Sequence, residues 1–328
     1  MNNPAPILDL IDAFRRSKTM FTAVAMGIFE MTPAALPALT EKLSANADAL
    51  ERLLDGCVGL GLLTREGQLF RNTEAADTYL RRDSKHSLAG YILYSNSVLF
   101  KLWANLEDAV KEGSNRWQQT FGTEGAIFSH FFQTEEAMRT FLNGMHGMGM
   151  LSSPPVTAAF DLSRFSKLVD LGGATGHLAI AAAERYPGLR AAVFDLPQVI
   201  AGAGQYPGSD KVQWIAGDFF EDALPQADLY AVGRILHDWS EPKIRRLLNK
   251  IFEALPPGGG LLIAEKIIRP DRSGPLPAHM QSLNMLICTE GKERTAEEYT
   301  ALLREAGFAS IEWRLTGAPL DALLAVKA

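Results

Sequence analysis

A histidine and two glutamates follow predicted strands in the C-terminal half of the chain. His237 comes after the apolar run 227–232, Glu265 ends the run 260–265, and Glu293 lies one predicted helix further on. Because open α/β sheets bind ligands outside the carboxyl ends of their strands, these side chains lie where chemistry is expected. A histidine can act as a general base there, with a carboxylate on its other ring nitrogen to fix the tautomer and stabilise the cation. The pattern leaves open whether Glu265 or Glu293 has that second role.

A glycine-rich turn lies earlier in the chain. The stretch 168–197 reads as strand, turn, helix, strand and acidic residue, which is the order of a nucleotide-binding βαβ unit. Gly172 and Gly173 permit a tight turn that approaches a ligand closely, and a helix begins near Gly176. Asp195 ends the second strand, at a position from which a carboxylate accepts both hydroxyls of a ribose.

The spacing within this turn distinguishes between cofactors. The pattern G-x-G-x-x-G of dinucleotide sites does not fit. The segment from Asp170 to Gly176 fits the looser D-x-G-x-G-x-G turn of S-adenosylmethionine sites, with Ala174 in the position of the middle glycine. We therefore expect S-adenosylmethionine as the cofactor, with the methyl group of Ala174 close to it.

Other chemically useful residues follow the third and fourth predicted strands. Gly217, Asp218 and Phe219 come after the third, where a carboxylate can accept the adenine amino group and an aromatic ring can cover the base. The segment 234–239, RILHDW, comes after the fourth. Both segments should lie at the same edge of the sheet as the glycine-rich turn.

The elements that must position these residues alternate as strand and helix from residue 166 onward. Such alternation predicts an open parallel sheet with helices on both faces. The last two strands are too close in sequence for a helical crossover, so they should pair antiparallel. This ending suits the α/β, Rossmann-like seven-stranded sheet of methyltransferases. The predicted strands are 168–171, 190–194, 211–215, 227–232, 260–265, 308–314 and 320–326.

Two further helical regions precede this sheet. Residues 7–29 read as an amphipathic helix, and residues 37–80 read as helix, helix, hairpin and helix, the order of a winged helix. Acidic residues on the second helix of the segment 37–80 would repel DNA phosphates, so we expect a dimerisation domain and not a DNA-binding domain. We predict an all-α winged-helix dimerisation domain over residues 1–100 and a catalytic domain over 101–328, with its Rossmann-like core at 166–328.

The intervening segment, residues 101–165, is rich in aromatic residues and methionine. Its histidines, His130 and His146, are expected to be structural. Within it, methionine and phenylalanine recur at three- or four-residue steps. This spacing marks one helix face that packs in the core or lines an adaptable pocket. The side chains on that face are Met138, Phe141, Met145 and Met148.

Composition limits the remaining possibilities. The 328 residues are 47% hydrophobic and 21% charged, as in a globular protein with a substantial core. A net charge of −6 with dispersed lysine and arginine argues against a nucleic-acid partner. The sequence has no leader pattern and no apolar run long enough for a membrane span, so we expect a cytoplasmic protein without a membrane partner. Cys57 and Cys288 suggest neither disulfides nor a metal site, and Cys57 should lie in the core.

Several motifs carry a resemblance to a known family. The segments GDFF, RILHDWSE, PPGGGLLIAEKI, SLNMLICTEGKERT and TGAPLDALLAVKA are similar to plant-type small-molecule O-methyltransferases, and the similarity covers nearly the whole chain. Among these, the chain most resembles members that methylate N-acetylserotonin. The resemblance implies a homodimer with interlocking winged-helix domains. It also implies methyl transfer from S-adenosylmethionine to the hydroxyl of a small aromatic acceptor, a hydroxyindole such as N-acetylserotonin or a phenol, without a metal.

Roles for individual residues follow from the resemblance together with the turn, the strand ends and the helical segment. His237 matches the family's general base, and Glu265 and Glu293 match the acidic residues that flank it. The expected cofactor-binding residues are Asp170, Gly172, Gly173, Gly176, Asp195, Leu196, Gly217, Asp218, Phe219, Arg234 and Trp239. The expected substrate-binding residues are Asp238, Asn284, Met285, Cys288, Met138, Met145 and Trp103.

Two more positions differ from the family pattern. By the resemblance, Cys288 stands where the members that methylate N-acetylserotonin have glutamine. Phe132 similarly stands where they have a tyrosine that contacts the cofactor. Two alternative functions remain. One is a cofactor-binding member with non-methylating chemistry, hydroxylase or pericyclase-like, against which the complete set of His237, Glu265 and Glu293 argues. The other is a regulator that binds DNA or protein through the winged helix, against which the acidic helix argues.

Overall fold

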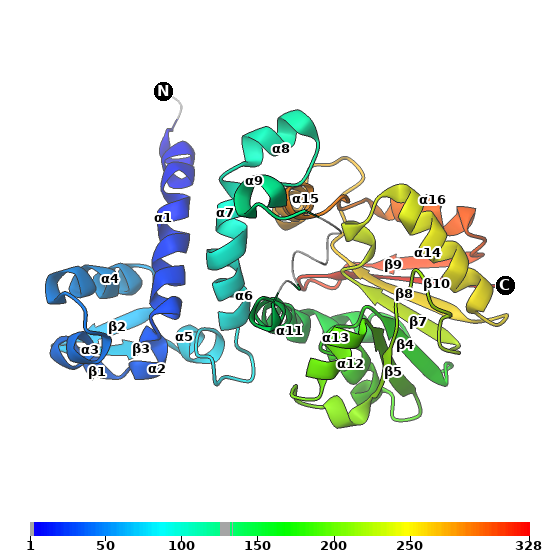
Figure 1. The fold of residues 1–328 in the computed structure, drawn as a ribbon, viewed down its shortest axis with the longest axis horizontal. Helices are drawn as coiled ribbons and strands as arrows, with labels where there is room; N and C mark the ends of the chain where they lie inside the picture. Colours follow the sequence, from blue (N-terminus) through cyan, green and yellow to red (C-terminus); the bar gives the residue numbers. More distant parts are fainter. Residues whose placement is uncertain (1–2, 125–131, 133) are drawn as a thin grey trace. The chain divides into compact units, whose positions relative to one another are not determined.

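The computed structural model describes residues 3–124, 132 and 134–328. The chain divides into two compact units, Met1–Lys101 and Leu102–Ala328 (Figure 1). Each unit has its own core, and each is described separately below. Within the described residues, no helix combines the length and the apolar character that crossing a membrane requires.

The first unit is helical apart from a small three-stranded sheet. The single helix expected over residues 7–29 is instead two helices, because Gly27 takes a left-handed φ of 72° between them. The predicted winged-helix order follows, and β1 joins the expected hairpin by pairing antiparallel with β3. The elements are α1 (Ala5–Ala25), α2 (Ile28–Met31), β1 (Ala34–Ala35), α3 (Leu36–Leu43), α4 (Ala47–Gly59), β2 (Leu63–Glu66), β3 (Leu69–Asn72), α5 (Glu74–Tyr79), α6 (Ala89–Tyr94) and a π-helical turn (Ser95–Leu99).

The core of the first unit is built on α4. Leu50, Leu54 and Cys57 recur at helical spacing on one face of this helix and are buried in one cluster with Phe29 and Phe70. The expected place of Cys57 in the core is thereby confirmed.

The second unit contains the predicted seven-stranded sheet. Its order is β6-β5-β4-β7-β8-β10-β9, and β10 runs antiparallel to both of its neighbours, as expected from the short connection before it. The seven strands are β4 (Lys167–Leu171), β5 (Arg190–Asp195), β6 (Gln213–Ala216), β7 (Leu229–Gly233), β8 (Gly260–Glu265), β9 (Ser310–Arg314) and β10 (Asp321–Val326). The central strands are mostly buried apolar runs because both faces of the sheet are covered there, whereas the edge strands β6 and β9 are partly exposed.

Helices cover both faces of this sheet. In Figure 1, α14 and α16 lie on one side, and α11, α12 and α13 lie on the other. Strand β4 pairs with β5 on one side and β7 on the other, so the chain changes direction across the sheet at β4, the place where open α/β sheets bind ligands. The helices are α7 (Phe100–Trp103), α8 (Leu106–Glu112), α9 (Trp117–Phe121), α11 (Glu135–Ala158), α12 (His177–Arg185), α13 (Pro197–Ala203), α14 (Glu241–Ala254), α15 (Leu276–Cys288) and α16 (Ala296–Glu305).

Candidate active site

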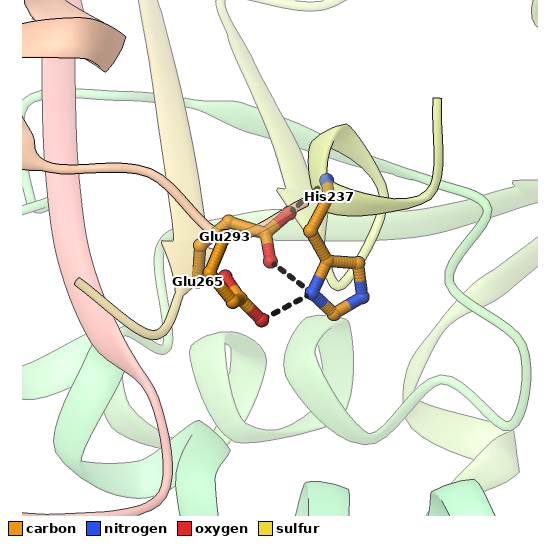
Figure 2. A group of neighbouring side chains, drawn as sticks. All are labelled: His237, Glu265 and Glu293. Atoms are coloured by element: carbon orange, nitrogen blue, oxygen red, sulfur yellow. Dashed lines mark hydrogen bonds and ion pairs between the residues drawn. The ribbon is translucent and has the colours of Figure 1, made fainter. Parts of the chain in front are cut away.

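The three predicted catalytic side chains meet in the second unit. His237 lies in a short 3₁₀ turn after β7, Glu265 ends β8, and Glu293 lies between α15 and α16. Nδ1 of His237 forms a hydrogen bond of 2.7 Å with Oε1 of Glu293 and lies 3.1 Å from Oε2 of Glu265 (Figure 2). All three side chains are buried. The arrangement therefore brings both glutamates to the same ring nitrogen.

This contact fixes the tautomer of the imidazole. A nitrogen that faces two carboxyl groups carries the hydrogen, so the lone pair of neutral His237 lies on Nε2. Among the described residues, the carboxyl oxygen that approaches Nε2 is Oδ1 of Asp238, at 3.7 Å, which is beyond hydrogen-bonding distance. Burial raises the pKa of Asp238 to about 7. Nε2 is thus free to accept a proton.

The two glutamates differ in their surroundings. Oε1 of Glu265 accepts the backbone N–H groups of Leu236 at 2.8 Å and Ile235 at 3.0 Å, whereas no backbone group among the described residues donates to Glu293. Oε2 of each glutamate has no hydrogen-bond partner among these residues. Burial raises the pKa of Glu265 to about 6 and that of Glu293 to about 8. Because backbone donors favour the charged form, we assign the negative charge to Glu265 and the proton to Glu293.

Two residues of the loop before α16 hold this cluster together. A Cβ atom on Gly291 would lie 2.2 Å from the carbonyl oxygen of His237, so only glycine lets the loop pass there. The buried guanidinium of Arg294 donates to the carbonyl oxygens of Leu236 at 3.4 Å and Lys292 at 3.0 Å. Neither Gly291 nor Arg294 was assigned a role from the sequence, although the motif GKERT contains both.

The glycine-rich turn is packed as closely as its sequence predicts. Gly172 and Gly176 take left-handed φ angles of 67° and 76°. A Cβ atom on Gly172 would come within 2.6 Å of Ile235, and one on Gly173 would come within 2.6 Å of the Asp170 carboxylate. The turn therefore has no room for side chains at these positions.

Asp195 and the turn are joined directly. Oδ2 of Asp195 accepts the backbone N–H of Ala174 at 2.8 Å, and Oδ1 accepts that of Leu196 at 2.7 Å. Each carboxylate oxygen keeps a lone pair that could accept a ribose hydroxyl. Burial raises the pKa of Asp195 to about 6 and that of Asp170 to about 8. Ala174 itself takes a left-handed φ of 51°.

The other expected cofactor residues lie after β6 and β7. Oδ1 of Asp218 accepts the backbone N–H of Phe220 at 2.8 Å. The ring of Phe220 lies 4.8 Å from that of Phe219 and 5.0 Å from that of Trp239, so the three aromatic residues form one continuous group. Close packing at Gly217 requires glycine, since a Cβ atom there would lie 2.4 Å from a phenylalanine ring.

Arg234 carries an unsatisfied donor. Its backbone takes a left-handed φ of 56°, and its buried Nε has no hydrogen-bond partner among the described residues. Together these groups fit S-adenosylmethionine. Asp195 can accept the ribose hydroxyls, Asp218 and the aromatic rings suit adenine, and the glycines permit close approach. The unpaired guanidinium nitrogen of Arg234 can donate to the carboxylate of the cofactor. Backbone strain at such a position is characteristic of functional sites.

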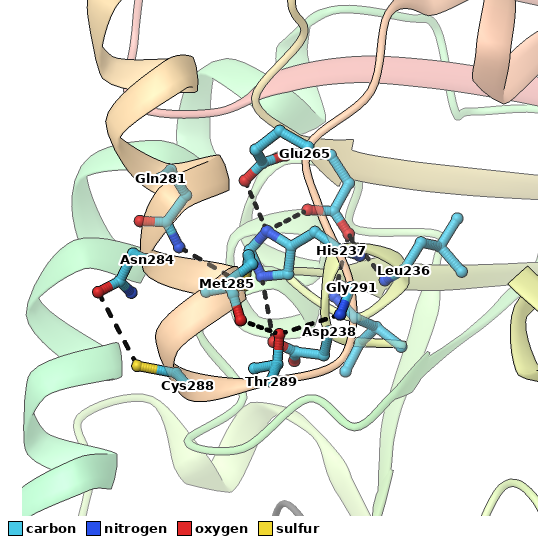
Figure 3. A network of polar contacts seen from close by, with 12 residues as sticks. Leu236, His237, Asp238, Glu265, Gln281, Asn284, Met285, Cys288, Thr289 and Gly291 are labelled. Atoms are coloured by element: carbon cyan, nitrogen blue, oxygen red, sulfur yellow. Dashed lines mark hydrogen bonds and ion pairs between the residues drawn. The ribbon is translucent and has the colours of Figure 1, made fainter. Parts of the chain in front are cut away.

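Several expected substrate residues also come together. The indole N–H of Trp103 donates to Oδ1 of Asn284 at 3.0 Å, and Sγ of Cys288 lies 3.9 Å from the same oxygen. Figure 3 shows Asn284, Met285 and Cys288 on α15, next to His237 and Asp238. Because an indole nitrogen can only donate, Asn284 must turn its oxygen toward Trp103, which leaves its amide NH₂ group for another partner.

The two expected methionines lie on α11. Met138 packs against a cluster formed by Leu142, Val199 and Tyr206, which also contacts the cofactor turn at Ala174. Met145, on α11, is partly buried. The substrate assignment of both methionines stays a prediction.

Other residues of the helical segment were also singled out from the sequence. Phe132 packs against the same cluster as Met138. Nδ1 of His146 lies 2.9 Å from Oγ1 of Thr175, in the glycine-rich turn. His130 lies outside the described residues. The segment thus supports the cofactor turn from the side of α11.

Models of two protein domains match the chain. Residues 103–309 match an O-methyltransferase domain, and residues 8–82 match an O-methyltransferase dimerisation domain. Together these matches account for both units of the structure.

Individual proteins match over the full chain. The acetylserotonin O-methyltransferase of Gallus gallus is 39% identical, over 100% of this chain and 98% of its own. A Homo sapiens protein described as a probable bifunctional dTTP/UTP pyrophosphatase/methyltransferase is 41% identical over 99% of this chain and 54% of its own. The crystal structure of human N-acetylserotonin methyltransferase in complex with SAM has a TM-score of 0.96 and 37% identity, covering 100% of this chain and 99% of that one.

Proposed function

The chain belongs to the O-methyltransferase family, and we propose that it methylates the hydroxyl of a hydroxyindole or a related phenol, with His237 as the general base. S-Adenosylmethionine is the methyl donor. The single observation that carries the assignment of the base is the contact of Nδ1 with Glu293 and Glu265, which leaves the lone pair on Nε2.

The chemistry requires a hydroxyl oxygen that loses its proton as it attacks. When bound, S-adenosylmethionine supplies a methyl group on a positively charged sulfur, which keeps the electron pair of the broken bond and leaves as a neutral thioether. Nε2 of His237 accepts the hydroxyl proton. A phenol has a pKa of about 10 and an imidazole one of about 6.5, so complete proton transfer before attack would cost about 5 kcal/mol. Proton transfer therefore accompanies the attack.

The imidazolium that forms needs a counter-charge. The negative charge on Glu265 lies 3.1 Å from Nδ1 and stabilises the cation. Glu293 accepts the Nδ1–H hydrogen bond and holds the ring in place. The remaining acceleration comes from alignment of the reactants, which is worth about 7–11 kcal/mol in well-oriented systems.

The acceptor is selected around α15. Asn284 offers a hydrogen-bond donor, because Trp103 already occupies its oxygen. A hydroxyindole with a carbonyl group on its side chain, such as N-acetylserotonin, suits that donor, and the relatives named for that substrate support it. Cys288 adds an apolar wall and no amide. These features favour a flat aromatic acceptor with a carbonyl substituent.

Methyl transfer to a panel of acceptors tests this proposal. The purified protein is incubated with labelled S-adenosylmethionine and N-acetylserotonin, serotonin or simple phenols, and products are detected by mass spectrometry. We expect a product heavier by one methylene, with N-acetylserotonin preferred over serotonin. Binding of S-adenosylmethionine without methylation of any acceptor would favour non-methylating chemistry.

The same assay tests for a metal. One possible ligand atom each from His237, Glu265 and Glu293 lies within 4.8 Å of the others, a spacing that could hold a metal ion. We expect an unchanged rate in EDTA, and a rate that is lost in EDTA and restored by a metal would contradict the metal-free mechanism.

A further inference from the structure

A second cluster of basic side chains lies at the start of α12, apart from the general base. His177 is the first residue of this helix, directly after the left-handed Gly176. Its Nδ1 lies 2.8 Å from Oγ of Ser153, on α11. No hydrogen bond to its other nitrogen, Nε2, is formed among the residues that the structure describes. The imidazole is therefore oriented through Nδ1, and Nε2 remains for another partner.

Gly149 makes room for this imidazole. A Cβ atom on Gly149 would lie 2.2 Å from Cδ2 of His177 and 2.5 Å from its Nε2, far inside van der Waals contact. Gly149 lies in the interior of α11, where glycine costs about 0.5–1 kcal/mol relative to alanine. The position of the ring therefore depends on the absence of a side chain at residue 149.

Arg234 approaches the same place from β7. A Cβ atom on Gly233 would lie 3.4 Å from Leu178, so the end of β7 packs against the first turn of α12. Burial, together with the nearby His146 and Arg234, lowers the pKa of His177 to about 3, so its imidazole is neutral. The buried Nε of Arg234 has no hydrogen-bond partner within the described part of the chain. Nε2 of His177 and Nε of Arg234 are thus two donors that the described residues leave unpaired.

The place of these two donors relative to the other cofactor contacts identifies the acceptor that they lack. Asp195 suits the ribose, and it contacts the turn through Ala174. The reactive sulfur must face His237, which lies three residues after Arg234. The amino-acid end of the cofactor, which ends in a carboxylate, then extends toward the start of α12, where N–H groups and the helix dipole also favour negative charge.

We propose that His177 and Arg234 together bind the carboxylate of the methionyl part of the cofactor, with Gly149 admitting the imidazole and Ser153 orienting it. Nε2 of His177 donates one hydrogen bond to the carboxylate, and the guanidinium of Arg234 donates another. His177 is thus a cofactor-binding residue in addition to those expected from the sequence. This inference rests on S-adenosylmethionine as the cofactor, as stated under the proposed function.

Binding of two ligands that differ only in the carboxylate tests the inference. Affinities for S-adenosylmethionine and for its decarboxylated form are measured by calorimetry on the full chain. For the unaltered protein we expect tighter binding of S-adenosylmethionine. In His177→Ala its affinity should fall about tenfold or more, the range for loss of a hydrogen bond to a charged group. The affinity for the decarboxylated form should change less than about twofold, because that ligand never makes the bond.

Three further variants separate this role from simple packing. His177→Gln can place an amide nitrogen near the position of Nε2, whereas His177→Asn places one near Nδ1, so Gln should preserve more of the preference for the carboxylate. Gly149→Ala should displace the ring and reduce that preference without altering His177 itself. These three variants also keep the test valid if His177→Ala fails to fold.

The outcomes are distinguishable. Equal losses for both ligands in every variant, or no loss for either, would overturn the role of His177 while the cofactor assignment stands. Failure of the unaltered protein to bind either ligand would overturn the cofactor assignment and the inference together.

Discussion

At the scale of single residues, the position of one proton decides how the candidate base works. Nδ1 of His237 faces two carboxyl groups, and a buried site of this kind cannot hold two negative charges without large cost. Backbone N–H groups stabilise the charge on Glu265, whereas none donates to Glu293 in the described part of the structure. The two glutamates should therefore respond differently to the same substitution.

Exchange of each glutamate for glutamine tests this difference. Glu265→Gln removes the charge that stabilises the imidazolium, so we expect kcat to fall about 10²-fold or more. Glu293→Gln replaces a neutral acid by a neutral amide of the same shape, so its kcat should fall less than about tenfold. Steady-state methyl transfer at saturating substrate measures both. A larger loss for Glu293→Gln would mean that the proton lies on Glu265.

The same proton makes stability depend on pH. Burial raises the pKa of Glu293 to about 8 in the folded state, from the ordinary glutamate value of 4.5. The folded state thus binds more protons in this range, so the free energy of unfolding falls as pH rises from about 4.5 to 8. Glu293→Gln should flatten this dependence, which urea denaturation at several pH values would measure. An equally steep decline in the variant would contradict the raised pKa of Glu293.

Individual site residues could be predicted where they follow strands. His237, Glu265 and Asp195 come directly after apolar runs, and the topology of open sheets then brings them to one edge. His177 and Gly149 could not be found this way. They depend on one another through a contact between two helices, and a lone glycine within a helical pattern gives no signal of the ring that it admits.

At the scale of elements, the glycine-rich turn contains a strained alanine. Ala174 takes a left-handed φ of 51°, which costs a residue with a Cβ about 1–2 kcal/mol. Its N–H nevertheless donates to Asp195, so the turn still positions the carboxylate that is expected to bind the ribose.

Ala174→Gly should relieve this strain. We expect a free energy of unfolding higher by up to about 1 kcal/mol, because relief of the left-handed strain outweighs the entropy that glycine gains in the unfolded chain. Affinity for S-adenosylhomocysteine should not decrease. Ala181→Gly, within the right-handed α12, is the matched control and should destabilise by about 0.5–1 kcal/mol. Thermal denaturation and calorimetry measure both, and destabilisation by Ala174→Gly would contradict the strain.

Element types were predicted better than their ends. All seven strands of the large sheet were expected. The buried parallel strands are continuous apolar runs with clear limits, and the last two strands are too close in sequence for a helical crossover. The break between α1 and α2 was missed because a single glycine is tolerated in most helical patterns. Strand β1 was missed because two residues are too few to show alternation.

At the scale of the whole molecule, α1 has an exposed apolar face within the region that matches a dimerisation domain. Leu10 is 70% exposed and Phe14 is 56% exposed, and Ile7 and Ile11 are also exposed on this helix. Such a face on a monomer would be an unusually large apolar patch. We therefore propose that it is covered by a second copy of the chain.

Charged substitutions on α1 test the dimer. The double variant Leu10→Glu and Phe14→Glu should halve the mass measured by light scattering, because the charges cannot be buried against a second copy. Asp12→Asn on the same helix should leave the mass unchanged. A monomeric mass for the unaltered chain, or a dimer that resists the double substitution, would contradict this interface.

The central claim is that His237 is the base of an S-adenosylmethionine-dependent O-methyltransferase. The most direct measurement compares His237→Ala with the unaltered protein in two assays, methyl transfer to the best acceptor and calorimetric binding of S-adenosylhomocysteine. We expect the rate to fall by about 10²- to 10⁴-fold while affinity for S-adenosylhomocysteine changes less than about threefold. A near-normal rate in His237→Ala would contradict the assignment of the base. Loss of S-adenosylhomocysteine binding would mean that His237 supports the cofactor site instead.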